Sequence, residues 1–326
     1  MREDVAEHDW IAAHVFYPAR LDNLITRVAG PLAADLRERD QLEGFFFLRY
    51  WDGGNHLRFR VLPRRGSDRG RIRHTIEERF ARYLDEHPAT APPDTVPYEQ
   101  LAPRLARWEG VAEPAPRYPD NTVQFLAYRQ EHARYGHGAT MAAAERHFTE
   151  SSRLALRLLE SAPSPDRRAT AGFVVIVLAW LCCDARTPWV RTPEREPSIP
   201  HVDGQEPGPE ELRHRWEAQR DTLCALTRKL RAAHDAQRAG SAEHGHMGEW
   251  TRSITTLLAV LRERYASGAF TPPVRGWDRD TTLGRYDAVA PVIDICAHLF
   301  CNRIGVSPTE ENYLRLLAAR ALRETG

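Results

Sequence analysis

The residues with the clearest chemical potential stand in residues 44–63, GFFFLRYWDGGNHLRFRVLP. Two runs rich in aromatic and aliphatic residues flank Asp-Gly-Gly-Asn, which is typical of a tight β-hairpin turn. Because side chains alternate along a strand, the second run places His56, Arg58 and Arg60 on one face and only apolar residues on the other. Guanidinium groups bind carboxylate or phosphate through paired, charge-assisted hydrogen bonds. The segment predicts an anion-binding face, and a solvated strand face is the alternative.

A second group of charged residues lies in residues 128–138, YRQEHARYGHG. Glu131 and Arg134 are three residues apart, so they can pair on one helical turn. A glutamate held beside an arginine orients that arginine for an anion. The alternative is a surface salt bridge, which contributes at most about 1 kcal/mol to stability.

The third group lies in residues 294–305, DICAHLFCNRIG. In a helix, His298 shares one face with Asp294 one turn earlier and with Asn302 one turn later. A carboxylate at this distance fixes the imidazole tautomer and raises its basicity, which suits a general acid or base near neutral pH. A hydrogen-bonded core histidine is the alternative interpretation.

Composition and charge exclude several classes of protein. The 326 residues are 42% hydrophobic and 28% charged, with a formal net charge of zero, so no overall field attracts nucleic acid or an anionic membrane. We find no secretory signal, and the longest apolar run, residues 171–183, is shorter than the roughly 20 residues of a membrane span. It predicts a buried helix. Five cysteines, two of them adjacent, form no disulfide pattern, which indicates a reduced, cytoplasmic protein without membrane contact.

Metal and cofactor motifs are also missing from the sequence. His244 with His246, and His298 with Cys301, lack the paired ligand spacing of a zinc site. The chain contains no phosphate loop, dinucleotide fingerprint or nucleophile elbow. The sequence therefore predicts no metal and no cofactor.

The order of elements predicts an α+β fold, with helices covering an antiparallel sheet and a helix-rich second half. We expect one domain over residues 1–326, β-rich from 1 to 135 and α-rich from 136 to 326. Strands are expected at about 10–18, on both sides of the hairpin turn and at 121–130, and helices at about 21–36, 71–86, 140–161, 173–181, 210–238, 247–265, 286–303 and 308–323. Proline-rich connectors bracket one short segment, near residue 100, whose structure the pattern leaves open. Residues 191–211 are expected to form a loop.

Five stretches together carry a resemblance to a known family. They are W..AHVFYP from Trp10, FFFLRYWDGGNHLRFR at 45–60, EHARYG at 131–136, AAAERHFTESSRLAL at 142–156 and AHLFCNR at 297–303. In order and wording they resemble the C-terminal elimination domain of LanB-type lanthipeptide dehydratases, which also occurs as a stand-alone protein in thiopeptide biosynthesis. The resemblance extends over residues 10–323. One departure is His137, where the family commonly has a second glycine.

The resemblance implies a reaction and a set of residues. Enzymes of this family remove glutamate from glutamylated Ser or Thr in a precursor peptide and leave a dehydroamino acid. The family pattern places the elimination site at Arg58, Arg60, Glu131, Arg134 and His298, all of which are present. We expect the three arginines and His298 to be catalytic, with His298 transferring the proton. We expect Glu131, together with His56 and Asn302, to bind and orient substrate.

The resemblance also implies partners. The substrate is a ribosomally made precursor peptide with leader and core parts. A separate protein must install the glutamate from glutamyl-tRNA, since nothing in this chain resembles a tRNA-dependent transferase. Direct contact with nucleic acid is not expected.

Two other functions stay open from the sequence. Thiopeptide pathways use the same fold in pyridine synthases, which join two dehydroalanines by a formal [4+2] cycloaddition and release the leader peptide. Those enzymes expel no glutamate, so the retained arginines favour elimination unless they only stabilise the fold. The other alternative is a non-catalytic protein that binds the leader peptide as an added strand.

Overall fold

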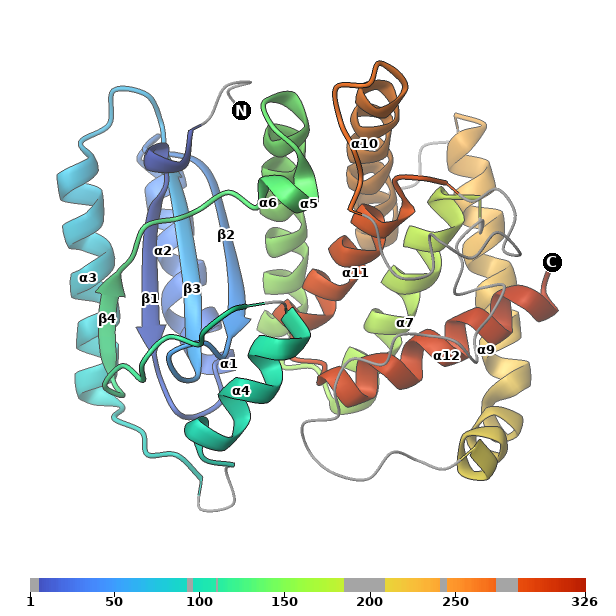
Figure 1. Ribbon diagram of the computed structural model, residues 1–326, viewed down its shortest axis with the longest axis horizontal. Helices are drawn as coiled ribbons and strands as arrows, with labels where there is room; N and C mark the ends of the chain where they lie inside the picture. The colour runs from blue at the N-terminus through green and yellow to red at the C-terminus, as the bar shows by residue number, and fades with distance from the viewer. Residues whose placement is uncertain (1–5, 93–95, 110, 185–208, 241–244, 274–286) are drawn as a thin grey trace. The chain divides into compact units, whose positions relative to one another are not determined.

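The computed structural model describes residues 6–92, 96–109, 111–184, 209–240, 245–273 and 287–326 (Figure 1). The described residues divide into two compact units that interleave along the chain. The first contains residues up to Gln130 with 151–162 and 303–305, and the second contains 131–150, 163–302 and 306–326. The expectation of a single domain stays a prediction. The expected α+β fold with an antiparallel sheet is confirmed.

The first unit is built on a four-stranded antiparallel sheet with the strand order β2-β3-β1-β4. Its strands are β1 (Ile11–Phe16), β2 (Leu42–Tyr50), β3 (His56–Pro63) and β4 (Thr122–Phe125). All four coincide with segments in which the sequence predicts a strand. The two central strands are β3 and β1, so the residues that the hairpin predicts as functional lie in the middle of the sheet.

The strand register separates a polar face from an apolar face. In β3, His56 lies opposite Tyr50, and Arg60 lies opposite Phe46 of β2. On the other side of β3, Arg58 lies opposite His14 of β1. Because directly opposed residues point to the same side of a sheet, these side chains share one face, as the alternation predicts for His56, Arg58 and Arg60.

Helices cover the apolar face. Helix α3 (Arg69–Glu86) packs against β1 and β4, and α2 (Gly30–Glu38) packs against β2 (Figure 1). The side chains that α3 buries recur every three or four residues, which is the spacing of one helix face; they include Ile72, Ile76 and Phe80. The ring of Phe80 meets that of Phe59 edge to face, with 5.5 Å between centroids. Before α2 the chain forms the short α1 (Asp22–Leu24) and one π-helical segment, Ile25–Ala29.

The outer edge of β2 is covered by side chains. The backbone N–H of Phe47 donates to Ser152 Oγ (3.2 Å), in the second half of α6 (Ala139–Glu160). Arg303 Nε donates to the carbonyl oxygen of Phe47 (3.0 Å), and its Nη1 donates to Ser151 Oγ (3.1 Å). Exposed edges accept foreign strands unless they are blocked. These contacts block the β2 edge at Phe47.

The hairpin turn is held by residues outside the hairpin. The backbone N–H of Gly53 donates to the hydroxyl of Tyr98 (2.8 Å), the first residue of α4 (Tyr98–Glu109). Asp52 accepts from the N–H of Ala115 (2.7 Å), and the Tyr98 hydroxyl donates to the Ala115 carbonyl (2.5 Å). Gly53 has a φ of 84°, a conformation that favours glycine. The turn is therefore fixed by contacts as well as by its own sequence.

The second unit is helical. It contains α5 (His132–Tyr135), the first half of α6, α7 (Pro165–Cys182), α9 (Pro209–Arg238), α10 (His246–Ala266), most of α11 (Ala290–Ile304) and α12 (Pro308–Glu324). Helix α7 packs against α9, α10 and α12, and large side chains such as Phe173 and Trp180 are buried. The buried helix predicted from the apolar run is confirmed.

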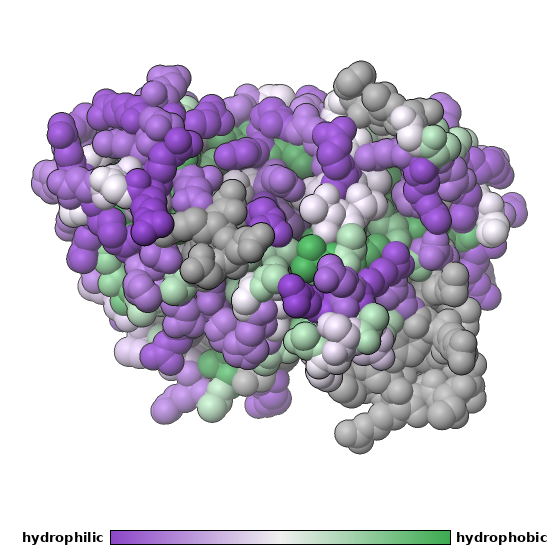
Figure 2. Space-filling model, turned by 90° about the horizontal axis from the view of Figure 1, so that it is seen from above, coloured by the Kyte–Doolittle hydropathy of each residue, from purple (hydrophilic) through white to green (hydrophobic). Residues whose placement is uncertain are grey.

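No helix in the part of the chain that the structure describes has the length and apolar character to cross a membrane. The molecular face seen in Figure 2 is mostly hydrophilic, with apolar residues in scattered patches. Scattered apolar surface is ordinary for a folded protein. All five cysteines are buried, and none of them forms a disulfide bond.

Most helices agree with the sequence pattern to within a few residues. Helix α7 begins at Pro165, eight residues before the expected start at 173, and two other segments also differ. The segment that the sequence leaves open is α4, which contains Pro103. Of the expected loop at 191–211, residues 191–208 lie outside the described residues, and 209–211 begin α9.

Candidate functional site

The polar face of the sheet contains a histidine pair that the sequence analysis missed. His14 Nδ1 lies 3.1 Å from His56 Nε2, and the rings stack with centroids 4.9 Å apart. His56 Nδ1 lies 2.8 Å from the carbonyl oxygen of Gly54. The ring of His56 is fully buried. Both of its nitrogens therefore have protein partners, and the expected contact of His56 with substrate stays a prediction.

Burial keeps both histidines neutral. Burial, reinforced by the charge of Arg58, lowers the pKa of His14 from 6.5 to about 2. Burial likewise lowers the pKa of His56 to about 3, and the carbonyl of Gly54 opposes this shift only in part. At neutral pH the pair therefore carries no charge, and the positive charge of this face belongs to the arginines.

This pair predicts a dependence of stability on pH. A histidine with a lowered folded pKa stabilises the fold fully above its unfolded pKa of 6.5, and this contribution is lost as pH falls below that value. The free energy of unfolding should then decrease as the pH is lowered below 6.5, by up to about 1.4 kcal/mol per pH unit per histidine. Denaturant unfolding at pH 7.5, 6.5, 5.5 and 5.0 measures this slope. The free energy of unfolding of His14→Gln should depend less steeply on pH than that of the wild type below pH 6. An equal slope would contradict the lowered pKa of His14.

The two hairpin arginines are held by aromatic rings. The guanidinium carbon of Arg58 lies 3.3 Å from the centroid of the Tyr50 ring. That of Arg60 lies 4.4 Å from the Tyr128 ring and 5.2 Å from the Phe46 ring. Each such contact contributes about 0.5–2 kcal/mol. Stacking occupies the flat face of a guanidinium and directs its recognition through the N–H edge. The arginines are thus fixed in orientation, and Arg60 is only 8% exposed.

The turn at Glu131 lies in the second unit and is a surface feature. Arg134 Nη1 pairs with Glu131 Oε2 at 2.8 Å, as the spacing predicts, with side chains 42% and 47% exposed. The departure at His137 leaves the turn closed by other contacts. The His137 ring stacks on that of His132 at 4.0 Å, and His132 Nδ1 lies 2.8 Å from the Gly136 carbonyl oxygen. The roles of Glu131 and Arg134 stay predictions.

His298, also in the second unit, has a carboxylate partner, but not the predicted one. Its Nδ1 lies 2.8 Å from Glu311 Oε2 of α12, and Glu311 is 1% exposed. The expectation that Asp294 orients His298 was wrong. Asp294 accepts from Arg315 Nη1 (2.5 Å) and from Trp180 Nε1 (3.0 Å), because it is needed to compensate the buried charge of Arg315.

Arg315 links the two carboxylates in one chain of contacts. Its Nε donates to Glu311 Oε1 at 2.9 Å, one helical turn away on α12. Burial alone would raise the pKa of Glu311, but the attraction and hydrogen bonds of His298 and Arg315 outweigh it and lower that pKa to about 2. Glu311 is therefore ionised at neutral pH. The i, i+4 spacing of Glu311 and Arg315 is visible in the sequence, but it does not reveal that they face α11.

The ionised partner determines the tautomer of His298. A carboxylate only accepts hydrogen bonds, so Nδ1 carries the proton and the lone pair of the neutral ring lies on Nε2. The His298 side chain is 27% exposed. This arrangement matches the orientation of a general base by a buried carboxylate. Asn302, one turn further along α11, is partly exposed, and its role stays a prediction.

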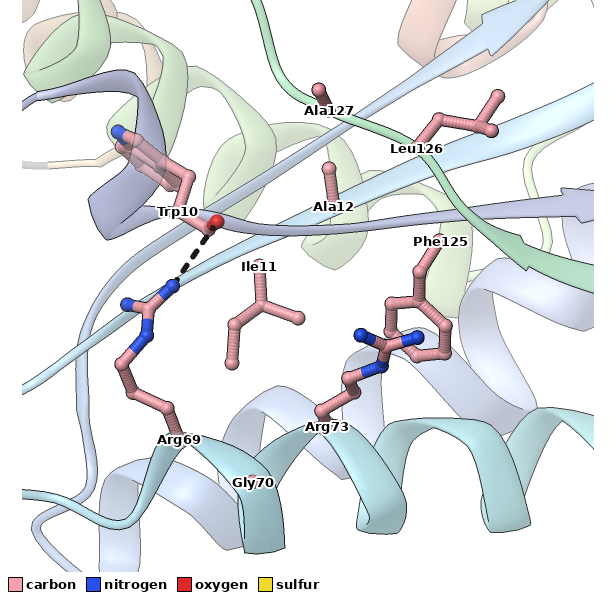
Figure 3. A pocket seen from close by; sticks show the side chains of 9 residues that line it. All are labelled: Trp10, Ile11, Ala12, Arg69, Gly70, Arg73, Phe125, Leu126 and Ala127. Atoms are coloured by element: carbon pink, nitrogen blue, oxygen red, sulfur yellow. Dashed lines mark hydrogen bonds between the residues drawn. The ribbon is translucent and has the colours of Figure 1, made fainter.

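A pocket of about 440 Å³ lies elsewhere in the first unit, between α3 and the point where β4 leaves β1 (Figure 3). Arg69 contacts the Trp10 carbonyl, and the guanidinium carbon of Arg73 lies 4.3 Å from the Phe125 ring centroid. None of the predicted site residues lines this pocket. It nevertheless borders the polar face, because Ala12 in its lining lies opposite Arg60 in the sheet.

Within the described residues, no three His, Cys, Asp or Glu side chains gather as a metal site would require. Of the histidines considered as ligands, His244 lies outside the described residues and His246 begins α10.

The fold is similar to three solved structures. Pyridine synthase TbtD from thiomuracin biosynthesis has a TM-score of 0.71 and 21% identity, over 97% of this chain and 98% of that one. TsrL has a TM-score of 0.65 and 17% identity, over 97% and 95%. The tRNA-dependent lantibiotic dehydratase MibB from Microbispora sp. 107891 has a TM-score of 0.51 and 18% identity, over 99% of this chain but 29% of MibB. At these identities the likeness concerns the fold.

No curated protein matches the chain. The family description "Lantibiotic biosynthesis dehydratase C-term", by contrast, matches residues 10–322, which include the hairpin, the turn at Glu131 and the helix of His298. The chain belongs to the lantibiotic biosynthesis dehydratase C-terminal family.

Proposed function

We propose that the protein modifies a ribosomally made precursor peptide by eliminating glutamate from glutamylated Ser or Thr residues. The observation that carries the proposal is the pairing of His298 with the buried, ionised Glu311 at 2.8 Å. This pairing gives the second unit a histidine with a defined basic nitrogen, which a proton abstraction requires. The family and the retained residues supply the substrate class.

The reaction needs few groups. The base takes the α-proton of the glutamylated residue, the electron pair of that C–H bond forms the Cα–Cβ double bond, and the Cβ–O bond breaks. Glutamate leaves as a carboxylate with the electrons of the Cβ–O bond, and the proton stays on the base. In this proposal His298 is the base, and arginine guanidiniums stabilise the departing carboxylate. Neither step requires a metal or a redox cofactor.

Arg60 tests the assignment of the arginines. Arg60→Gln should lower the turnover of a glutamylated peptide about 10²-fold, because the departing carboxylate loses a charged donor. Arg60→Lys keeps the charge but loses the paired N–H donors of the guanidinium, so its turnover should lie between those of the wild type and Arg60→Gln. The matched control is Arg64→Gln, since Arg64 is an exposed arginine close by that pairs with Asp40. Turnover is measured by mass spectrometry, with the melting temperature recorded for each variant. Full turnover in a folded Arg60→Gln protein would reduce Arg60 to a packing residue.

A second candidate function, pyridine synthesis, is favoured by one observation. The chain and TbtD, named a pyridine synthase, cover each other almost completely, whereas the chain spans 29% of MibB. In a formal [4+2] cycloaddition of two dehydroalanines, His298 would move protons during tautomerisation and loss of the leader. The guanidiniums of Arg58 and Arg60 would then serve mainly to hold the aromatic face together.

Mass spectrometry of two reactions separates the candidates. The first contains precursor peptide, a glutamylating partner, glutamate, tRNA and its synthetase, and elimination appears as the loss of one water per modified Ser. The second contains a fully dehydrated peptide, and cycloaddition appears as release of the leader. Change only in the first supports the eliminase, and change only in the second supports the pyridine synthase. No change in either, with the leader peptide bound, would favour the non-catalytic binding protein.

A further inference from the structure

His14 has one ring nitrogen without a partner, although the residue is 94% buried. Its exposed fraction is 6%, and within the described residues its only hydrogen-bond partner is His56, through Nδ1. The other nitrogen, Nε2, is thus an unpartnered polar atom on the polar face of a central strand. It is not among the described side-chain atoms that are buried without a hydrogen-bond partner, so it keeps access to solvent and a ligand can reach it.

The contacts determine which nitrogens carry protons. The Gly54 carbonyl only accepts, so His56 Nδ1 carries the hydrogen that donates to it. A neutral His56 then has its lone pair on Nε2, and His14 Nδ1 must donate across the 3.1 Å contact. The neutral His14 is left with its lone pair on Nε2. A chain of two hydrogen bonds thus joins His14 through His56 to the hairpin turn. At its other end, His14 Nε2 is a hydrogen-bond acceptor on the sheet face.

The neighbours of His14 restrict what it can bind. Arg58 lies directly opposite on β3, and Arg60 lies two residues further along that strand. Two permanent positive charges disfavour a cationic donor such as an ammonium group. A neutral N–H or O–H donor remains, and a peptide offers one backbone N–H at nearly every residue. An acceptor beside a guanidinium donor also matches the two polar groups of a peptide unit, because the N–H donates and the C=O accepts.

We propose that His14 is a substrate-binding residue that accepts a hydrogen bond from a backbone N–H of the precursor peptide at Nε2, with Arg58 beside it as the donor to that peptide's carbonyl groups. The inference rests on the proposed function, because it takes a peptide as the substrate. It holds for either reaction, since both act on a peptide backbone. His56 then acts indirectly, by fixing the tautomer of His14.

Two variants separate binding from structure. In His14→Asn, the side-chain N–H₂ lies near the position of Nδ1, so the bond to His56 is retained and the acceptor at Nε2 is lost. In His14→Gln, the amide reaches the position of Nε2, so the acceptor is retained and the donor to His56 is lost. If Nε2 binds the peptide, His14→Asn weakens binding about tenfold and His14→Gln keeps it within about twofold. A purely structural histidine gives the reverse order.

The measurement is the Kd of a fluorescein-labelled synthetic precursor peptide, determined by anisotropy, with the melting temperature of each variant. A scan of N-methylated peptides identifies the donor. One N-methyl group should weaken wild-type binding about tenfold and leave His14→Asn binding unchanged. Equal Kd values for the wild type and His14→Asn overturn the inference while the proposed function stands. Absence of peptide binding by the wild type removes the proposed function and, with it, this inference.

Discussion

Replacing His298 with glutamine should lower the rate of the proposed elimination by about 10²–10⁴-fold, while peptide binding changes little. Glutamine keeps a hydrogen-bonding group on the same helix face but supplies no basic nitrogen near neutral pH. In the wild type, the 2.8 Å contact between His298 Nδ1 and Glu311 orients the imidazole ring as a base. The variant has no imidazole for Glu311 to orient. Single-turnover rates on a glutamylated peptide separate the chemical step from binding.

The matched control for His298 is His214→Gln, which changes an exposed histidine of α9. It should keep the wild-type rate. If His298→Gln keeps that rate as well, the proton acceptor lies elsewhere, and the contact with Glu311 is a structural ion pair. If the variant instead loses leader release from a dehydrated peptide, His298 is confirmed as a proton-transfer residue but the reaction is the cycloaddition.

The hairpin was predictable because its determinants are local. The Asp-Gly-Gly-Asn turn and a period of two specify a pair of strands and their faces, and the structure has His56, Arg58 and Arg60 on one of them. His14 lies 42 residues before His56, and only the register between β1 and β3 brings the rings together. A single sequence contains no signal for that register. The alternation of IAAHVF places a histidine within a buried strand, and this was the available hint.

The environment of His298 shows where local spacing fails. Asp294 lies four residues before His298, but its carboxylate accepts hydrogen bonds from Arg315 and Trp180 instead. The carboxylate that orients His298 comes from the next helix, and helix spacing alone does not show which faces of α11 and α12 meet. Buried charges pair with whichever opposite charge compensates them best. Contacts between helices therefore decided the outcome.

Glu311→Gln should cost about 3–5 kcal/mol of unfolding free energy, the largest effect on stability that we expect. Removing one partner of a buried ion pair leaves the other charge uncompensated, and Arg315 is only 5% exposed. Asp294 still pairs with Arg315, which places the expected loss at the lower end of that range. Catalysis should fall as well, because glutamine does not enforce the tautomer of His298.

The pH dependence distinguishes loss of the Glu311 charge from loss of packing. The folded pKa of Glu311 is lowered to about 2, against an ordinary value of 4.5. Its stabilising contribution is therefore complete above pH 4.5 and disappears as pH falls toward 2. Wild type and Glu311→Gln should differ most at neutral pH in denaturant unfolding, and their difference should shrink below pH 4.

Glu310→Gln is the matched control for Glu311→Gln, because it changes the preceding residue on the same helix, where burial raises the carboxyl pKa. Since burial disfavours the charged form of Glu310, losing its charge should not cost stability. A gap between wild type and Glu311→Gln that persists unchanged to pH 3 would mean that Glu311 acts through its shape. In that case the ionised-carboxylate account of His298 would fail, and with it the assignment of Nε2 as the basic nitrogen.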